Sequence, residues 1–394
     1  MQKNRALFID KEALATLSMV SMGVLFPVTG LMNKKEAAEV DKTGMYKGKS
    51  FPFSFILAPS GRTNQAILKS AKKGEVLDLV CNGEKKGELV VGDIFEIDPI
   101  KRVQKIYNTT DMSHPGITKT LERLGSMAVS GDYFVEFDDV KNALEKVKKK
   151  REYLEAKNVT GLVVAARPLH RAHERVIRQA LENTDMLVIF LTKPYLEDLL
   201  PPYELRRKVI DFFIKNFLPS EKIVVVPLEN TYIFAGSIEV ILNAIVVKNF
   251  GCTKFLVGQN HAGLGVHYKK KKISTIFDNL VGIDIEIETV SEFVYCNMCK
   301  TLVTANTCPH GQHHHISYHS DSILELFKVG ILPPAVLIRK EISAMMLAYL
   351  FPGRFKNIPK LYYDFIPSSG LIEEHSEEDF YLSLMTLYQT SSLT

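Results

Sequence analysis

The sequence predicts a mixed α/β protein with a β-rich N-terminal domain, a central parallel α/β domain and a small C-terminal domain. Short apolar runs separated by turn residues fill the N-terminal part, whereas apolar runs alternate with amphipathic helical segments further along the chain. A cluster of cysteines and histidines follows this alternation. We therefore place the domains at residues 1–155, 156–325 and 326–394.

Composition excludes several classes of protein. A net charge of +4 over 394 residues gives no case for a nucleic-acid partner. The apolar stretch Leu17–Met32 is broken by Gly23, Pro27 and Gly30, so it is too interrupted to span a membrane, and no cleavage site marks it as a signal peptide. We expect a cytoplasmic protein without nucleic-acid or membrane partners.

The N-terminal domain contains several strand-like runs. Asn82-Gly83, between two of them, is typical of a hairpin turn. If the strands close on each other, the domain is barrel-like. The charged segment Val140–Leu154 is compatible with a solvated helix that connects the first domain to the second. The predicted strands are Phe51–Leu57, Glu75–Cys81, Glu88–Ile97 and Tyr133–Phe137.

The central domain alternates strands and helices, which predicts a parallel sheet covered on both faces. Ligands of such sheets bind beyond the carboxyl ends of the strands, where the strand order reverses. The predicted strands are Leu162–Ala166, Met186–Leu191, Lys222–Pro227 and Lys254–Val257, and the predicted helices are Tyr203–Phe217, Ser237–Asn249 and one that begins at His170.

A pair of histidines at the start of a helix is the principal candidate site. His170 and His173 are three residues apart and therefore share one helix face. The helix N-terminus favours anions, so the two imidazoles could hold a polyphosphate and stabilise charge on a leaving group. The H-x-x-H spacing alone has a simpler interpretation, namely that both histidines are ordinary solvated polar residues in the first turn of a helix. The turn Gly258–Gly263 also follows a strand, so both turns can face one crevice.

The cysteine cluster has the spacing of a structural zinc site. Cys296, Cys299 and Cys308 are followed by four histidines, so three thiolates and one imidazole would complete a tetrahedral site within residues 296–315. We choose His313 as the fourth ligand, with His310 or His314 as alternatives.

Six motifs along the chain resemble those of ATP sulfurylase, the sulfate adenylyltransferase family, in its short bacterial and archaeal form. The resemblance extends over nearly the whole length and includes the cysteine cluster. The motifs are FPVTGLM (26–32), TTDMSHPG (109–116), PLHRAHE (168–174), FAGSIE (234–239), KNFGCT (248–253) and VGQNHAG (257–263).

The resemblance implies a PUA-like N-terminal domain, a nucleotidyltransferase-type central domain and a homo-oligomer. It also implies that ATP, with Mg²⁺, and sulfate react to adenylyl sulfate and pyrophosphate, while Zn²⁺ has a structural role. His170, His173 and Arg167 would be catalytic, and Arg167 and the amide of Ala262 would contact sulfate. The nucleotide would contact Val164, Ala165, Ala166, Arg167, His170, His173, Gly258, Gln259, Asn260 and His261.

The family's I-S-G-T match is broken after Ser317, and two motifs that supply cations in the family also depart from its pattern. The family's Q-T-R-N falls on Val164–Arg167, and its Arg-Asp pair becomes Gln259-Asn260. Two lost arginines, each worth roughly 1.5–3 kcal/mol per charged hydrogen bond, would reduce transition-state stabilisation by about 100-fold to 10,000-fold. Three hypotheses follow: a sulfate adenylyltransferase that uses Arg167 for sulfate, an adenylyltransferase for a less charged acceptor, or a catalytically decayed paralogue with a binding or regulatory role.

Overall fold

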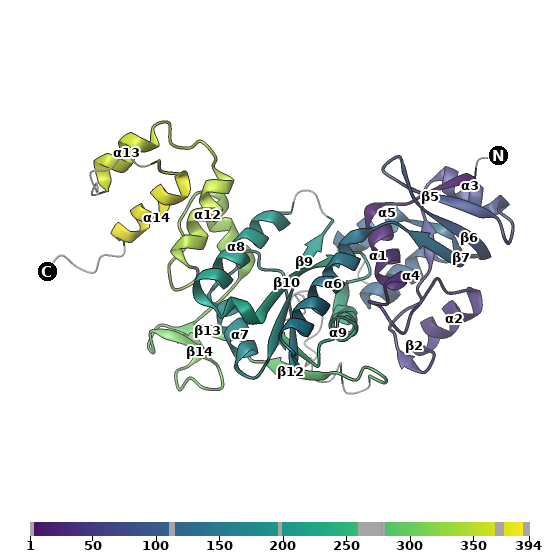
Figure 1. The fold of residues 1–394 in the computed structure, drawn as a ribbon, viewed down its shortest axis with the longest axis horizontal. Coiled ribbons are helices and arrows are strands. Elements are labelled where there is room, and N and C mark those ends of the chain that lie inside the picture. Colours follow the sequence, from purple (N-terminus) through teal and green to yellow (C-terminus); the bar gives the residue numbers. More distant parts are fainter. Residues whose placement is uncertain are drawn as a thin grey trace. The chain divides into compact units, whose positions relative to one another are not determined.

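The N-terminal sheet contains a tight hairpin. In the computed structural model, which describes residues 4–109, 115–195, 199–258, 277, 280–366 and 374–388, Asn82 and Gly83 have φ angles of 51° and 80°. A two-residue hairpin turn needs these left-handed conformations, so the predicted turn is confirmed. The strand order is β1-β5-β6-β7-β4, and Figure 1 labels the three central strands, β5, β6 and β7. The strands are β1 (Arg5–Phe8), β4 (Leu57–Pro59), β5 (Val76–Cys81), β6 (Glu84–Glu96) and β7 (Leu124–Val135).

The N-terminal sheet is open rather than closed. Strands β1 and β4 form its two edges and are not paired with each other in the part of the chain that the structure describes. The strand predicted for Phe51–Leu57 begins only at Leu57. Phe51, Phe53 and Phe55 are at most 2% exposed, so their alternation reflects burial in the core and not strand pairing.

Short helices pack around this sheet. Asp10 caps α1 by accepting a hydrogen bond from the backbone N–H of Ala13, and α1 contacts β7. None of the helices that the structure describes is long and apolar enough to cross a membrane. The elements are α1 (Lys11–Ser21), α2 (Lys34–Thr43), α3 (Arg62–Ser70), α4 (Pro99–Tyr107), α5 (Pro115–Arg123), β2 (Met45–Tyr46) and β3 (Lys49–Ser50).

The charged connecting segment forms a helix as predicted, α6 (Asp138–Tyr153). It is more than a solvated connection, because Val140, Ala143 and Val147 are buried at helical spacing. Lys146 Nζ also donates a hydrogen bond to the carbonyl oxygen of Val225, at 3.1 Å. One lysine of the charged segment therefore holds the helix against the central sheet.

The central sheet is parallel, as predicted, with the strand order β10-β9-β8-β11-β12. The chain begins this sheet at β8, moves outward through β9 and β10, and then returns to the other side of β8 with β11. The order therefore reverses between β8 and β11, which is where such sheets bind ligands. The strands are β8 (Val159–Val164), β9 (Met186–Pro194), β10 (Ile223–Asn230), β11 (Lys254–Gly258) and β12 (Glu286–Val290).

Helix α9 (Glu239–Asn249) packs directly against β8 and β11. Gly161 in β8 makes this approach possible, because a Cβ atom at this position would overlap Cγ1 of Val247 and lie 3.2 Å from Sγ of Cys252. The remaining helical elements between the strands are α7 (Arg171–Glu182), α8 (Tyr203–Phe217), η1 (Ser220–Lys222) and η2 (Gly236–Ile238).

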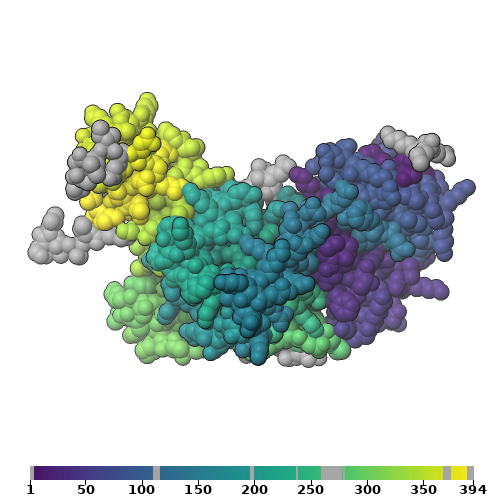
Figure 2. All heavy atoms as spheres, in the orientation of Figure 1, coloured from purple at the N-terminus to yellow at the C-terminus, as the bar shows by residue number. Residues whose placement is uncertain are grey.

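The chain divides into two units. One contains both large sheets and comprises residues 1–164, 183–196 and 222–290. The other comprises residues 165–182, 197–221 and 291–394 and includes α7, α8 and a small antiparallel sheet of order β14-β13-β15. Helices α12 and α14 of this unit pack together, and Figure 2 shows its C-terminal atoms in yellow-green and yellow. Its remaining elements are β13 (Phe293–Cys296), β14 (Thr301–Thr304), η4 (Gln312–His314), β15 (His315–Ser317), α11 (Ser320–Lys328), α12 (Lys340–Leu350), α13 (Ile358–Phe365) and α14 (Glu377–Tyr388).

Candidate active site and metal centre

The two histidines of the H-x-x-H motif lie against each other at the start of α7. Their ring centroids are 3.7 Å apart and the planes differ by 27°, so the rings are stacked. The backbone N–H of His170 donates to Nδ1 of His173 at 3.3 Å. Nε2 of His170 lies 3.1 Å from Oγ of Ser320, and the ring of Tyr318 lies 5.3 Å from the His170 ring. The predicted shared face is confirmed.

Both imidazoles are neutral at pH 7. Burial lowers the pKa of His170 well below its usual value, and the neighbouring His173 lowers it further. Burial lowers the pKa of His173 to about 4. Because Nδ1 of His173 accepts the backbone hydrogen bond, the proton of the neutral ring is on Nε2, which can donate to an acceptor.

His170 also keeps an unused ring nitrogen. Its side chain is only 6% exposed, and its Nδ1 atom is buried without a hydrogen-bond partner in the described part of the chain. A buried polar atom without a partner costs free energy, which a ligand atom could recover. The histidine pair therefore presents polar nitrogen atoms in surroundings that exclude most water.

The predicted nucleotide-binding wall before the histidines is mostly buried. Val164 and Ala166 are 7% and 1% exposed, so a ligand could reach these positions mainly through the backbone. Ala166 has a φ angle of 49°, an unusual conformation for a residue with a side chain. Ala165 is exposed. Of the three predicted apolar contacts, only Ala165 offers an accessible side chain.

Arg167, the predicted sulfate ligand, is half-buried. Its Nε and Nη2 atoms donate to the carbonyl oxygen of Leu200 at 3.4 and 3.3 Å, which is long for a charged donor. Burial lowers the pKa of Arg167, and the carboxylate of Asp321 opposes this effect.

Arg206, a second arginine near this loop, is not among the residues predicted from the sequence. It is 2% exposed and donates from Nη1 to the carbonyl oxygen of Ala165 at 2.6 Å. A signal for it exists in the sequence, because Arg206 occupies the apolar face of α8 together with Val209, Ile210 and Phe213. An arginine in such a stripe indicates a buried cation.

The second predicted turn begins at the same sheet edge as the first. Strands β8 and β11 are parallel neighbours, so the chain leaves both of them, after Val164 and after Gly258, at their carboxyl ends. Gly258 is the last residue of β11. Gln259, Asn260, His261 and Ala262 lie outside the described residues, and their contacts with nucleotide and sulfate stay predictions.

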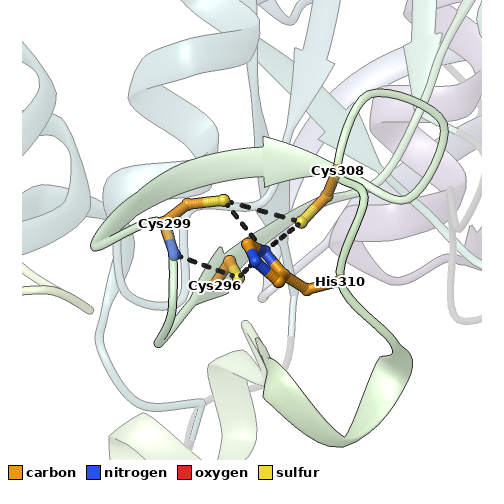
Figure 3. Close-up of side chains that lie close together, drawn as sticks. All are labelled: Cys296, Cys299, Cys308 and His310. Carbon is orange, nitrogen blue, oxygen red and sulfur yellow. Dashed lines mark hydrogen bonds between the residues drawn. The ribbon is translucent and has the colours of Figure 1, made fainter.

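The cysteine cluster forms a compact group of metal-binding atoms (Figure 3). The sulfur atoms of Cys296, Cys299 and Cys308 and one ring nitrogen of His310 all lie within 4.8 Å of one another. Nδ1 of His310 is 3.5, 3.2 and 3.6 Å from the three sulfurs in turn. Three sulfur ligands and one imidazole are a donor set that suits a tetrahedral soft metal, so this group could bind a metal ion.

The structure groups His310, and not the predicted His313, with the three sulfurs. The ring of His313 lies over Gly311 and against His314, at a centroid distance of 4.1 Å, and is not part of the group. His314 is turned to Asn297, whose Oδ1 lies 2.9 Å from Nδ1 of His314. His310, one of the two alternatives, is the histidine whose ring nitrogen lies beside the three sulfurs.

Comparison with known proteins connects both parts of the chain to established families. The ATP-sulfurylase family model matches residues 138–349, and the PUA-like domain model matches residues 1–135.

Two curated relatives illustrate the similarity. A sulfate adenylyltransferase of Carboxydothermus hydrogenoformans is 28% identical over 355 residues, which are 87% of this chain and 91% of the relative. A sulfate adenylyltransferase of Desulforamulus reducens is 30% identical over 346 residues, which are 84% of this chain and 87% of the relative.

A solved structure shares the fold. The structure described as a hexameric APS kinase from Thiobacillus denitrificans matches with a TM-score of 0.65 and 17% sequence identity. The match covers 87% of this chain but 62% of that chain, so this chain spans less than two thirds of that protein's length. At this identity the match supports the fold alone.

Proposed function

Since the chain belongs to the ATP-sulfurylase family, we propose that it is a sulfate adenylyltransferase, which converts ATP and sulfate to adenylyl sulfate and pyrophosphate. In this reaction a sulfate oxygen attacks the α-phosphorus of ATP, the bond from this phosphorus to the bridging oxygen breaks, and pyrophosphate leaves. No covalent intermediate with the protein is needed. Catalysis therefore depends on positioning and on stabilising negative charge.

The stacked histidine pair is the observation that supports this proposal most directly. Nε2–H of His173 would donate to an oxygen of the leaving pyrophosphate, with the stacked His170 ring holding it in place. In surroundings that exclude water, such fixed hydrogen bonds stabilise the negative charge of the transition state more than they would in solution.

The remaining roles follow from the positions of the two turns. Residues 164–167 and 258–261 would contact the nucleotide, with Ala165 the exposed side chain among the first group. Arg167 and the backbone amide of Ala262 would contact sulfate. The supporting observation is that β8 and β11, which precede these turns, flank the point of strand reversal.

We also propose two metal ions with separate roles. Mg²⁺ would accompany ATP and neutralise charge on its phosphates. Zn²⁺ would be held by Cys296, Cys299, Cys308 and His310, and the four protein ligands leave it no open position for chemistry. The zinc would therefore stabilise the small sheet that contains β13.

We propose in addition that the chain forms a homo-oligomer. Large apolar side chains are exposed in its C-terminal part, at 68% for Val329, 53% for Ile331 and 57% for Phe365. Covering such side chains with a second copy would remove apolar surface from water.

The decisive experiment measures pyrophosphate release from magnesium-ATP with and without sulfate, and with molybdate as a substitute oxyanion. We expect oxyanion-dependent release, and we expect His173→Asn to reduce kcat/KM by about 100-fold or more, because one charge-stabilising donor is lost. His313→Asn, which changes an exposed histidine outside both sites, is the matched control. An unaltered rate in His173→Asn, or no release with either oxyanion, would refute the proposed activity.

A further inference from the structure

Arg206 is a buried cation whose hydrogen bonds are incomplete. Its Nη1 atom donates to the carbonyl oxygen of Ala165 at 2.6 Å, and its Nε atom donates to that of Pro201 at 3.1 Å. Its Nη2 atom is buried and has no partner among the described residues. The side chain is 2% exposed, so its Nη2 atom is shielded from bulk water.

A second guanidinium group acts on Arg206 through its charge. Arg167 donates to the carbonyl oxygen of Leu200, the residue next to Pro201, so the two side chains bind neighbouring carbonyl groups of one segment. Burial, and then the positive charge of Arg167, lower the pKa of Arg206 to about 10. Two cations are thus held close together within the same unit of the chain.

No carboxylate balances this pair in the part of the chain that the structure describes. Asp321 acts on Arg167 and Glu204 acts on Arg206 through their charges, but neither forms an ion pair with these arginines. Arg339 of the same unit shows the usual arrangement, because its Nε lies 2.8 Å from the buried carboxylate of Glu174.

The energetics favour an external counterion. Transferring a charge from water into a protein is costly unless it is paired and hydrogen-bonded, and a second cation nearby increases this cost. An anion between the two guanidinium groups would complete the hydrogen bonds of Arg206 and neutralise the pair. Planar guanidinium groups bind tetrahedral oxyanions particularly well, because two N–H groups can donate to two oxygens.

We propose that Arg206 and Arg167 together form the binding site for the oxyanion that accepts the adenylyl group. The inference deepens the proposed function and rests on it. Arg206 would supply, from α8, a second cation beside Arg167, in a loop where Ala166 falls on the family's arginine position. The acceptor is then a divalent tetrahedral oxyanion of the sulfate class, and not the less charged acceptor that the apolar residues Val164–Ala166 alone would suggest.

Steady-state kinetics of Arg206→Gln test this assignment. The KM for sulfate should rise roughly 10-fold to 150-fold, which corresponds to the loss of a charged hydrogen bond, while the KM for ATP should change less than about twofold. Arg206→Lys keeps the positive charge, so its KM for sulfate should lie between those of wild type and Arg206→Gln. Arg207→Lys is the matched control, because Arg207 is the adjacent residue and pairs with Asp211 at 2.7 Å. An unchanged KM for sulfate in Arg206→Gln would overturn the assignment.

Equilibrium binding separates this inference from the proposed function. Calorimetric titration of the full-length protein with sulfate should show binding to wild type and to Arg207→Lys, and much weaker binding to Arg206→Gln and Arg167→Gln. If sulfate binds in this way without any pyrophosphate release, the oxyanion site stands and the proposed activity fails. If pyrophosphate is released but neither the sulfate affinity nor the KM for sulfate changes in the variants of the two arginines, the proposed activity stands and the proposed oxyanion site is refuted.

Folding of the variants is followed by circular dichroism and thermal unfolding. Should Arg206→Gln not fold, the assignment is decided by Arg206→Lys and Arg167→Gln. Sulfate should raise the unfolding midpoint of wild type more than that of either variant, since a ligand stabilises the state that binds it. Equal shifts in wild type and both variants would contradict the site.

Discussion

At the level of single residues, the chemistry of this protein depends on polar groups that are buried without charge partners. His170 and His173 are neutral because burial removes the water that would stabilise an imidazolium ion. Arg206 retains its charge, because even a pKa of about 10 lies well above pH 7. The candidate site therefore combines two neutral imidazoles with charged guanidinium groups.

Protonation of His173 should destabilise the folded protein in acid. In the unfolded chain this histidine titrates near pH 6.5, whereas burial lowers its pKa to about 4 in the folded chain. Between these values the unfolded state binds more protons, so the free energy of unfolding falls as the pH falls. The stability that comes from the neutral ring is complete above pH 6.5 and is lost toward pH 4.

The variant His173→Asn isolates this effect. Between pH 7.5 and pH 5, wild type should lose about 2 kcal/mol more free energy of unfolding than His173→Asn, from a shift worth 1.36 kcal/mol per pH unit. Denaturant titrations at the two pH values measure the difference. Equal losses in the two proteins would show that His173 titrates normally in the folded state.

At the level of elements, the ends of short strands and helices position the metal group. Cys296 ends β13, Cys299 lies in the turn toward β14, and Cys308 and His310 follow β14, so the small sheet brings residues from two chain segments together (Figure 3). A metal ion bound there would link these segments, and much of its binding free energy would become folding free energy.

Removing a ligand should therefore weaken zinc binding far more than removing a neighbouring histidine. His310→Ala should lower zinc affinity by about 100-fold or more. Even the loss of a residue that only hydrogen-bonds to a metal ligand lowers metal affinity by about 10-fold to 100-fold, and the loss of a ligand should cost at least as much. His313→Ala should leave the affinity unchanged. Competition with a chromogenic chelator measures both affinities, and a stronger effect of His313→Ala would reverse our ligand assignment.

The contact between β8 and α9 depends on one glycine. Gly161→Ala should destabilise the protein by about 1–3 kcal/mol, because the added methyl group would overlap Val247 in a tightly packed core. Gly30→Ala is the matched control, since no atom lies within 4 Å of the corresponding Cβ position. Thermal unfolding of both variants tests the prediction, which fails if the two midpoints shift equally.

At the level of the whole molecule, the two family models match residues 1–135 and 138–349. Large apolar side chains are exposed in several parts of the described chain, and Val329, Ile331 and Phe365 are among those of the C-terminal part. Such side chains are expected to be covered in the active protein.

The proposed homo-oligomer predicts a solution mass that is a multiple of the 44.4 kDa chain. Light scattering coupled to gel filtration measures this mass directly. Phe365→Ser, which makes an exposed apolar position polar, should shift the distribution toward the monomer, while Phe134→Ser, at another exposed phenylalanine, should not. A wild-type mass of a single chain at micromolar concentration would contradict the proposal.

Much of the architecture could be predicted from local patterns. The alternation of strands and helices, the hairpin at Asn82-Gly83 and the bounds of α8 were all predictable, because apolar periodicity and turn residues act over a few neighbouring residues. The same patterns misled at Phe51–Phe55, where alternating phenylalanines are buried without strand pairing. Periodicity reports which side chains are buried, and only indirectly which backbone groups are paired.

By itself the sequence determined which groups are available: two histidines at the beginning of a helix, three cysteines at metal-binding spacing, and two strands that end in polar turns. Only the tertiary structure decided that His310 and not His313 lies with the sulfurs, that the imidazoles are stacked and neutral, and that Nη2 of Arg206 is buried without a partner among the described residues. The reason is that spacing along the chain limits which atoms can meet, whereas charge and hydrogen bonding depend on distances through space and on the exclusion of water.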